Sequence, residues 1–414
     1  MSRIERAAWP RPEEFPAAPD AEALRRWDGA DRSARPVRLA RLRSRLAREG
    51  LDAYFGIRRE HMRYLTGFTL ADGEEKVAGH SGQFIVGAAE VIVLADTRYA
   101  IQAAREAGQA RIEPTTYDLP ARWGDLVGSL GARRVGVEAG FVNHALWGRL
   151  AAAAPGVELV PIEGWIEADR AAKEPAEVER IAAACAVADR ALSALLPEIV
   201  PGVTERDLAW RLEVLMRTSG AEALAFDVAC LAGAEAALPH GSPRDQPIRR
   251  GQVLLFDFGA QVCGYRSDMT RTLFVGEPAA RDLAVYKVVA AAQGAAIRAV
   301  EGAVAEAART GGSLPDGRAI DRVAREVIDR DGRWPAYGHG LGHGIGLATH
   351  EHPSLSRAAA PTPLPTPTVF SIEPGIYLDG EMGVRIEDLV AVDAAVGRAE
   401  VLTRFPRGIV VVGE

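Results

Sequence analysis

The segment Val253–Thr272, VLLFDFGAQVCGYRSDMTRT, decides how this chain is interpreted. It predicts a β-hairpin, because an apolar strand from Val253 to Phe256 is followed by a turn region containing Gly264 and by a second strand at Met269–Val275. Apolar and β-branched residues are typical of buried strands. We therefore expect the hairpin to lie inside the protein rather than on its surface.

The hairpin carries two aspartates. If it is centred between Val262 and Cys263, Asp257 and Asp268 lie directly opposite each other. Two facing carboxylates on paired strands repel each other. The arrangement therefore predicts either a shared proton or a cation bound between the two side chains.

A second acid-bearing hairpin is predicted in Phe370–Val392, FSIEPGIYLDGEMGVRIEDLVAV. Glu373 and Glu387 are symmetric about Gly380, and their even separation of fourteen residues places them on one face. Between the two hairpins, the segment GHGLGHGIGLATHEHP holds four of the eight histidines. Four carboxylates and an imidazole gathered in one buried place predict a metal site.

Length and composition fit an ordinary globular protein. With 414 residues, two domains are expected; 25% of residues are charged and 48% hydrophobic. The net charge of −7 argues against nucleic acid as a partner. Three cysteines without a Cys-x-x-Cys pair suit the reducing cytoplasm, and the absence of a run of eighteen apolar residues argues against a membrane span.

The N-terminal half predicts an arm over residues 1–35 and an α/β domain over residues 36–165. A helix is expected from Pro36, with Leu39, Leu42 and Leu46 on one face and Gly50 at its end. Apolar strands then alternate with helical segments up to the strand ELVPI. This alternation is typical of α/β domains.

Residues 166–414 predict an α+β domain with an antiparallel sheet. A helix begins at Pro175, and Thr204 followed by Asp207 predicts the start of the next helix, which Gly220 ends. Two further helices are expected around residues 279–300 and 319–331. Helices therefore combine with the two acid-bearing hairpins.

Three segments carry a family resemblance: DFGAQVCGYRSDMTRT, HGLGHGIGLATHEHP and IEPGIYLDGEMGVRIED are similar to the signature segments of the pita-bread metallopeptidases. The resemblance is to the branch that contains proline dipeptidase and aminopeptidase P. RYLTGF, LADTRYAIQA and DRAAKEPAEVERI resemble parts of that branch's creatinase-like N-terminal domain and its junction with the catalytic domain. The resemblance covers residues 36–410 and implies a homodimer.

The resemblance also implies a two-metal centre and its ligands. Two divalent ions, Mn²⁺ foremost with Co²⁺, Zn²⁺ or Fe²⁺ as alternatives, would be held by Asp257, Asp268, His343, Glu373 and Glu387. An activated water would attack the scissile carbonyl while Glu373 relays the proton and His350 donates a hydrogen bond. His240 would grip the substrate together with His350, and Arg385 and Tyr377 would support the ligands. For His339, a role in the substrate pocket and a packed, hydrogen-bonded structural role are both expected alternatives.

The sequence leaves the length of the substrate and the class of function open. The expected substrate is a short peptide with proline at the second position, either an Xaa-Pro dipeptide or a longer peptide as in aminopeptidase P. A metal-free creatinase-like hydrolase or a scaffold protein on the same fold is the other class. The loops at residues 71–81 and 358–368 are candidates for shaping the entrance. Glu351, His352 and Cys263 are expected to be structural or to lie at the rim.

Overall fold

The computed structural model describes residues 6–70, 81–114 and 118–413. It divides the chain into two compact units, which are described separately. One, the N-terminal unit, contains Arg25–Asp169. The other, the catalytic unit, contains the residues up to Leu24 together with those from Arg170 onward.

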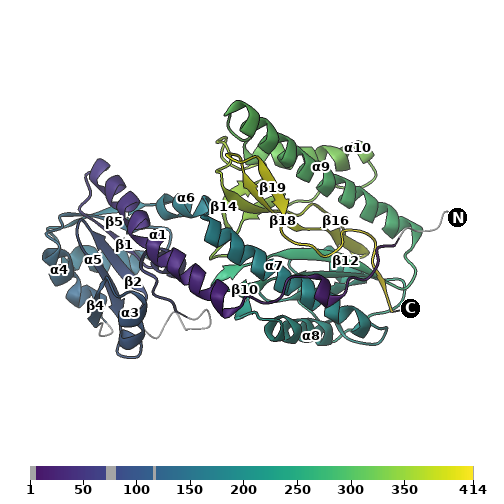
Figure 1. Ribbon diagram of the computed structural model, residues 1–414, viewed down its shortest axis with the longest axis horizontal. Helices are drawn as coiled ribbons and strands as arrows, with labels where there is room; N and C mark the ends of the chain where they lie inside the picture. The colour runs from purple at the N-terminus through teal and green to yellow at the C-terminus, as the bar shows by residue number, and fades with distance from the viewer. Residues whose placement is uncertain (1–5, 71–80, 115–117, 414) are drawn as a thin grey trace. The chain divides into compact units, whose positions relative to one another are not determined.

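The N-terminal unit is built on a six-stranded mixed sheet in the order β4-β3-β2-β1-β5-β6 (Figure 1). Strands β1, β5 and β6 are parallel, as are β3 and β4, whereas β2 is antiparallel to both of its neighbours. Phe55 of β1 packs edge-on against Trp123 of α4 in the core. The strands are β1 (Ala53–Gly56), β2 (Gln83–Gly87), β3 (Val91–Ala95), β4 (Arg111–Pro114), β5 (Arg134–Glu138) and β6 (Glu158–Ile162). The helices are α1 (Ala21–Arg48), α2 (Arg59–Thr66), α3 (Ala100–Glu106), α4 (Leu119–Ser129), α5 (His144–Ala153) and α6 (Trp165–Ala171).

The prediction that a helix starts at Pro36 is wrong. Helix α1 begins at Ala21 and passes through Pro36, and the Asp20 carboxylate accepts a hydrogen bond from the Ala23 amide at its start. A proline inside a helix removes one backbone hydrogen bond, and here the helix is packed against the protein on both sides of Pro36, where Trp27 and Arg38 are buried. The predicted end of the helix is confirmed. Gly50 follows the helix and has a φ of 63°, as is common for a glycine that ends a helix.

The segment before α1 belongs to the catalytic unit. The Trp9 indole donates to the Val411 carbonyl oxygen at 3.0 Å, and Arg6 forms a parallel β-bridge with Ile409. The predicted arm is therefore attached to the last strand, β20 (Val411–Val412).

The catalytic unit contains two larger sheets and a separate hairpin. One sheet has the order β20-β12-β9-β8 and the other β14-β13-β15-β18-β19, while β16 pairs with β17. A small sheet, β11-β10-β7, extends from the turn of the first hairpin. The strands are β7 (Ala223–Leu224), β8 (Ala229–Ala232), β9 (Val253–Phe258), β10 (Ala260–Val262), β11 (Tyr265–Arg266), β12 (Met269–Val275), β13 (Gly342–Gly344), β14 (Glu351–Leu355), β15 (Thr368–Ile372), β16 (Gly375–Leu378), β17 (Met382–Arg385), β18 (Asp388–Asp393) and β19 (Arg398–Val401).

Two pairs of helices cover these strands. Helices α7 (Pro175–Leu195) and α8 (Glu205–Thr218) lie on one side, and α9 (Ala280–Thr310) and α10 (Gly317–Asp331) lie on the other (Figure 1). The predicted starts of α7 and α8 are confirmed: Pro175 lies in the first turn, and the Thr204 hydroxyl accepts from the Asp207 amide. This layout is the α+β arrangement expected from the sequence.

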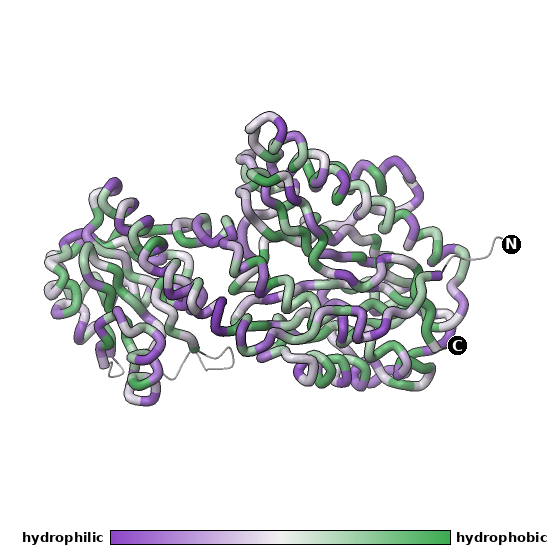
Figure 2. The backbone as a smooth tube through the Cα atoms, viewed as in Figure 1, coloured by the Kyte–Doolittle hydropathy of each residue, from purple (hydrophilic) through white to green (hydrophobic). Residues whose placement is uncertain are grey.

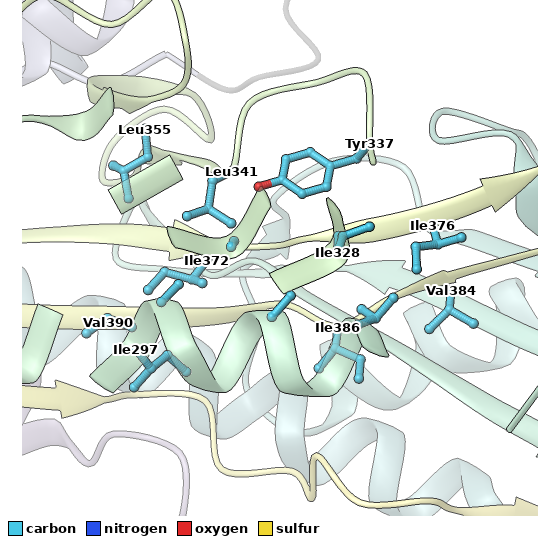
Figure 3. Close-up of a cluster of buried hydrophobic side chains, with 14 of the residues drawn as sticks. Ile297, Ile328, Tyr337, Leu341, Leu355, Ile372, Ile376, Val384, Ile386 and Val390 are labelled. Carbon is cyan, nitrogen blue, oxygen red and sulfur yellow. The ribbon is translucent and has the colours of Figure 1, made fainter. Parts of the chain in front are cut away.

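The core of the catalytic unit lies between α9, α10 and the curved strands. Figure 3 shows Ile297 and Ile328 from these helices near Ile372 and Val390 from the strands and Ile386 from the link between β17 and β18. Hydrophobic and hydrophilic residues alternate along α9, whose apolar residues join this core (Figure 2). By length and composition alone α9 could cross a membrane, but half of its most apolar window is buried in the protein, as in a core helix.

Candidate metal centre

The first hairpin has a different register from the predicted one. Its turn is centred between Cys263 and Gly264, both with positive φ, so Asp257 faces Thr270 rather than Asp268. Asp268 lies two residues before Thr270, immediately before β12 begins. Because side chains alternate along a strand, the aspartates still share a face, as diagonal neighbours instead of direct partners.

The second hairpin has the expected register. Gly375 pairs with Arg385, and Ile372 pairs with Asp388, so the pairing is symmetric about Gly380. Glu373 and Glu387 occupy the break between these two ladders. Their backbone amides donate to other segments instead, that of Glu373 to the Leu341 carbonyl oxygen at 2.8 Å and that of Glu387 to the Thr270 carbonyl oxygen at 3.1 Å.

His343 brings a nitrogen to this cluster. Its Nδ1 donates to the Gly344 carbonyl oxygen at 3.1 Å, which leaves Nε2 as the unprotonated nitrogen of the neutral ring. Nε2 lies 3.4 Å from a Glu373 oxygen and 3.7 Å from an Asp268 oxygen. Burial lowers the pKa of His343, so the ring is neutral near pH 7. The lone pair of His343 Nε2 and the carboxylates of Glu373 and Asp268 would be stabilised by a cation bound between them.

The carboxylates of the cluster also lack enough positive charge to balance them. One ligand atom each from Asp268, His343 and Glu387 lies within 4.8 Å of the others. Burial, reinforced by repulsion from neighbouring carboxylates, raises the pKa of Asp268 and of Glu387 well above the usual range. Asp257 Oδ1 and Glu387 Oε1 are buried without a hydrogen-bond partner in the described structure. Unpartnered buried oxygens around one nitrogen fit the donor set of a divalent metal centre.

Arg385 and Thr270 support the acids from behind. The Arg385 guanidinium donates to Asp257 at 2.5 Å, to the Thr270 hydroxyl at 2.8 Å and to the Tyr377 hydroxyl at 3.0 Å. The Thr270 hydroxyl in turn donates to Glu387 at 2.8 Å. A single arginine cannot balance four carboxylates, so this network orients the acids without neutralising them.

The remaining histidines line one cavity with the acids. The cavity has a volume of about 660 Å³, and its wall includes His240, His339, His343 and His350. His339 Nε2 accepts a hydrogen bond from the Tyr377 hydroxyl at 2.9 Å, because its Nδ1 donates to the Gly340 carbonyl oxygen. The His350 ring lies 4.2 Å from the His343 ring, and burial together with neighbouring histidines lowers its pKa to about 4.

Two glycines hold His343 against the sheet. A Cβ atom at Gly342 would lie 1.9 Å from the Ser371 carbonyl oxygen, and one at Gly344 would lie 2.1 Å from the His352 carbonyl oxygen. Neighbouring backbone therefore occupies the space of any side chain on either side of His343. The close approach expected from the alternating glycines is confirmed at these two positions, whereas Gly338 has open space.

Sequence reasoning missed several supporting residues. Besides Thr270, the Ser371 hydroxyl donates to Glu373 and accepts from the His343 amide, each at 3.1 Å. Both residues could have been found from spacing, because each lies two positions from an acid on the same strand face. Hydroxyl residues are so common in strands that this signal is weak without the register.

Glu351 is buried rather than at the rim. Its carboxylate accepts hydrogen bonds from Arg170 and from Lys173, the latter at 3.2 Å, and from the Ala348 amide at 2.8 Å. It thereby ties the loop that ends in His350 to the start of the catalytic unit. His352 is exposed, and Cys263 lies in the hairpin turn.

Two loops were expected at the entrance of the cavity. Residues 71–80 lie outside the described residues, and residues 358–368 do not line this cavity.

Two acid-bearing hairpins that surround one imidazole, inside a shell of four helices, define a metal-dependent hydrolase. A family comparison agrees: the chain belongs to metallopeptidase family M24, whose model matches residues 179–394. The Creatinase/Prolidase N-terminal domain matches residues 38–172. The family and the two-domain pita-bread fold implied by the sequence are therefore confirmed.

Relatives are similar over most of the chain or over somewhat more than half of it. An uncharacterised peptidase of Bacillus subtilis is 30% identical over 91% of this chain and 100% of its own length. The Xaa-Pro dipeptidase of Pyrococcus furiosus is 40% identical over 57% of this chain and 64% of its own.

Among solved structures, the Xaa-Pro dipeptidase from Bacillus anthracis has a TM-score of 0.81 and 32% identity, covering 91% of this chain and 99% of that one. The X-Pro aminopeptidase from Thermotoga maritima has a TM-score of 0.76 and 32% identity, covering 88% of this chain and 98% of that one.

Proposed function

We propose that this protein is a two-metal exopeptidase that hydrolyses Xaa-Pro bonds, with Xaa-Pro dipeptides as its principal substrates. The convergence of His343 Nε2 with the buried, unpartnered oxygens of Asp257 and Glu387 carries the proposal. The names of the similar bacterial and archaeal dipeptidases supply the substrate class. A metal-free hydrolase or scaffold on this fold would leave the gathered acids without a counter-charge.

The metal ligands are Asp257, Asp268, His343, Glu373 and Glu387. Two divalent ions bound there, Mn²⁺ foremost, would lower the pKa of a shared water and polarise the scissile carbonyl. The four carboxylates would supply oxygen ligands to the ions, and His343 would supply a nitrogen ligand. Four carboxylates balance the charge of two divalent cations.

Glu373 carries the proton in this proposal. Burial raises the pKa of its carboxyl, so the group can accept a proton near neutral pH and pass it to the departing proline nitrogen. The Ser371 hydroxyl holds one Glu373 oxygen at 3.1 Å, which orients the carboxyl during the transfer. Proton uptake and release at one side chain avoid the need for a second acid.

The histidines of the cavity wall position the substrate. His350 is neutral at pH 7, because its pKa is about 4, and it donates one N–H to the oxygen on which negative charge develops. His339 is fixed by Tyr377 and by its own backbone, and with His240 it grips the peptide. Arg385 holds Asp257 in place throughout.

The alternative of longer substrates is supported by the likeness to the Thermotoga maritima aminopeptidase. A homodimer, in which a partner's N-terminal domain would limit peptide length, and a cytoplasmic location are part of the same proposal. The three free cysteines suit a reducing compartment.

The test removes metal with a chelator and restores Mn²⁺, Co²⁺ or Zn²⁺ separately. Turnover of an Xaa-Pro dipeptide, an Xaa-Pro-Yaa tripeptide and creatine is then compared. We expect metal-dependent dipeptide cleavage and none of creatine. Cleavage of the tripeptide alone would make the protein an aminopeptidase P, and metal-independent turnover of creatine would refute the metallopeptidase proposal.

A further inference from the structure

A second cavity, of about 320 Å³, lies wholly within the N-terminal unit. Its wall is formed by one face of α1, the end of α2, the turn between β2 and β3, and the C-terminal end of α3 with the turn that follows. The charged residues of the wall are four arginines and one glutamate: Arg32, Arg35, Arg43, Arg105 and Glu106. This concentration of positive charge contrasts with the net charge of −7 of the whole chain.

Helix α1 presents three of these arginines together. Arg32, Arg35 and Arg43 are spaced at helical intervals, so they project from one side of the helix. The Arg35 guanidinium donates to the Glu106 carbonyl oxygen at 3.1 Å, and the Arg43 Nε donates to the Gly87 carbonyl oxygen at 2.9 Å. Both partners are backbone carbonyls, which fix the guanidinium groups without neutralising them. Arg32 is paired with Asp28 at 2.7 Å, and Asp31 and Asp28 partly offset the charge of Arg35, whereas Arg43 has no acidic partner among the described residues.

The Arg35 guanidinium packs against the backbone of Gly67. A Cβ atom at Gly67, where φ is 84°, would lie 2.0 Å from Arg35 Cζ, so the charged group lies directly on the glycine backbone. Arg35 Nε is buried without a hydrogen-bond partner in the described structure. Burial also lowers the pKa of Arg35, since the charge has lost part of its hydration.

The one carboxylate in the wall, that of Glu106, offsets at most one of the positive charges. Both Glu106 oxygens are occupied: one accepts from the Thr69 amide and hydroxyl, each at 2.8 Å, and the other accepts from Gln102 at 3.1 Å. Arg105 has no ion pair with any residue that the structure describes. Arg43 and Arg105 have no acidic partner within 4 Å among the described residues, so the cavity keeps an excess of positive charge, which favours a bound anion.

We propose that this cavity is a ligand site for a phosphate group, carried by a small molecule or present as free phosphate. Guanidinium groups match phosphate oxygens with paired hydrogen bonds, and several arginines suit a dianion better than a single carboxylate. The cavity is larger than a phosphate ion, so it has room for an attached organic part. The site is independent of the peptidase activity proposed above.

The test is isothermal titration of the full-length protein with inorganic phosphate, at an ionic strength held constant with sodium chloride. We expect saturable binding that Arg105→Gln weakens at least about ten-fold, a change of about 1.4 kcal/mol. Arg105 makes no hydrogen bond in the described structure, so this variant should fold normally. Arg43→Gln should weaken binding similarly.

Arg48→Gln is the matched control, because it removes the same charge from the same helix outside the cavity. It should leave phosphate binding unchanged, and so should Asp268→Ala at the metal centre. The proposal fails if no saturable binding occurs, if Arg48→Gln weakens binding as much as Arg105→Gln, or if Asp268→Ala abolishes it. Tighter binding of citrate than of phosphate would also overturn the assignment to phosphate.

Discussion

Thr270 is the residue that joins the two hairpins of the metal centre. Its hydroxyl donates to Glu387 of the second hairpin and accepts from Arg385, which holds Asp257 of the first. The Glu387 amide also donates to the Thr270 carbonyl oxygen at 3.1 Å. One small side chain therefore fixes the relative positions of acids that are more than one hundred residues apart in the sequence.

Thr270→Val keeps the shape of the side chain and removes these hydrogen bonds. We expect metal affinity, and kcat/KM for an Xaa-Pro dipeptide, to fall by roughly ten- to a hundred-fold, the usual cost of losing a residue that orients a metal ligand. Thr272→Val is the control, because its hydroxyl contacts only the backbone of Arg385. Equal losses in metal affinity for both variants would show that Thr270 has no special role.

Asp268→Ala tests the centre itself. We expect loss of activity beyond about a hundred-fold and failure to retain two metal ions, measured by atomic absorption. The metal-free variant should be at least as stable as the metal-free parent, because one repelling acid is gone. Asp379→Ala, in the exposed turn of the second hairpin, should change neither quantity. Near-normal metal content in Asp268→Ala would contradict its assigned role.

The sequence predicted the acids and two of their supports, Arg385 and Tyr377, but not Thr270 or Ser371. Glu373 and Glu387 could be paired because Gly380 marks an unambiguous turn. The Asp257 pairing was wrong by two positions, because nothing in the sequence shows that Cys263 adopts a positive φ beside Gly264. Thr270 was missed for the same reason, since its role depends on that register.

At the scale of elements, the loop between β13 and β14 carries His350 and is anchored by Glu351. Burial alone would raise the pKa of Glu351, but Arg170 and Lys173 hold it at about 2. A second anchor is the Arg266 amide, which donates to the Gly346 carbonyl oxygen at 2.9 Å. The position of His350 thus depends on two cations from the start of the catalytic unit.

Glu351→Gln should destabilise the protein at neutral pH by on the order of 3 kcal/mol, because two buried cations lose their anionic partner. A depressed pKa stabilises the folded state above the unfolded pKa, and that contribution disappears as pH falls towards 2. The difference in unfolding free energy between parent and variant should therefore shrink below about pH 4.5. A difference that is constant across this range would contradict the ion-pair interpretation.

The starts of helices were predicted correctly where the sequence contains a recognisable capping residue or first-turn proline. Thr204 and Pro175 placed the starts of α8 and α7, whereas Pro36 misplaced the start of α1. The overlooked signal was Asp20, whose carboxylate caps the helix fifteen residues earlier than expected. Packing of Trp27 then carries the helix through the proline, which no local pattern reveals.

At the scale of the whole molecule, the gathered acids make the metal-free protein sensitive to pH. Burial raises the pKa values of Asp268, Glu373 and Glu387, so the folded state binds more protons than the unfolded state above about pH 4.5. Stability of the metal-free protein should therefore fall as pH rises from mildly acidic towards neutral.

Chelation should accordingly lower Tm more at pH 8 than at pH 5, and added Mn²⁺ should restore it. Differential scanning calorimetry of metal-free and metal-loaded protein at both pH values measures this difference. Asp268→Ala should reduce the pH dependence of the metal-free protein. A Tm shift on chelation that is the same at both pH values would show that the acids are not coupled in the folded state.

The backbone contacts at Gly342 and Gly344 limit how this enzyme can be altered. Because carbonyl oxygens occupy the space on either side of His343, library mutagenesis of this strand should return almost only the parent sequence. Changes in substrate range are expected instead from the less buried lining residues Phe226, Asp227 and Ser242. An engineer who seeks a new specificity should randomise those residues and leave the histidine strand untouched.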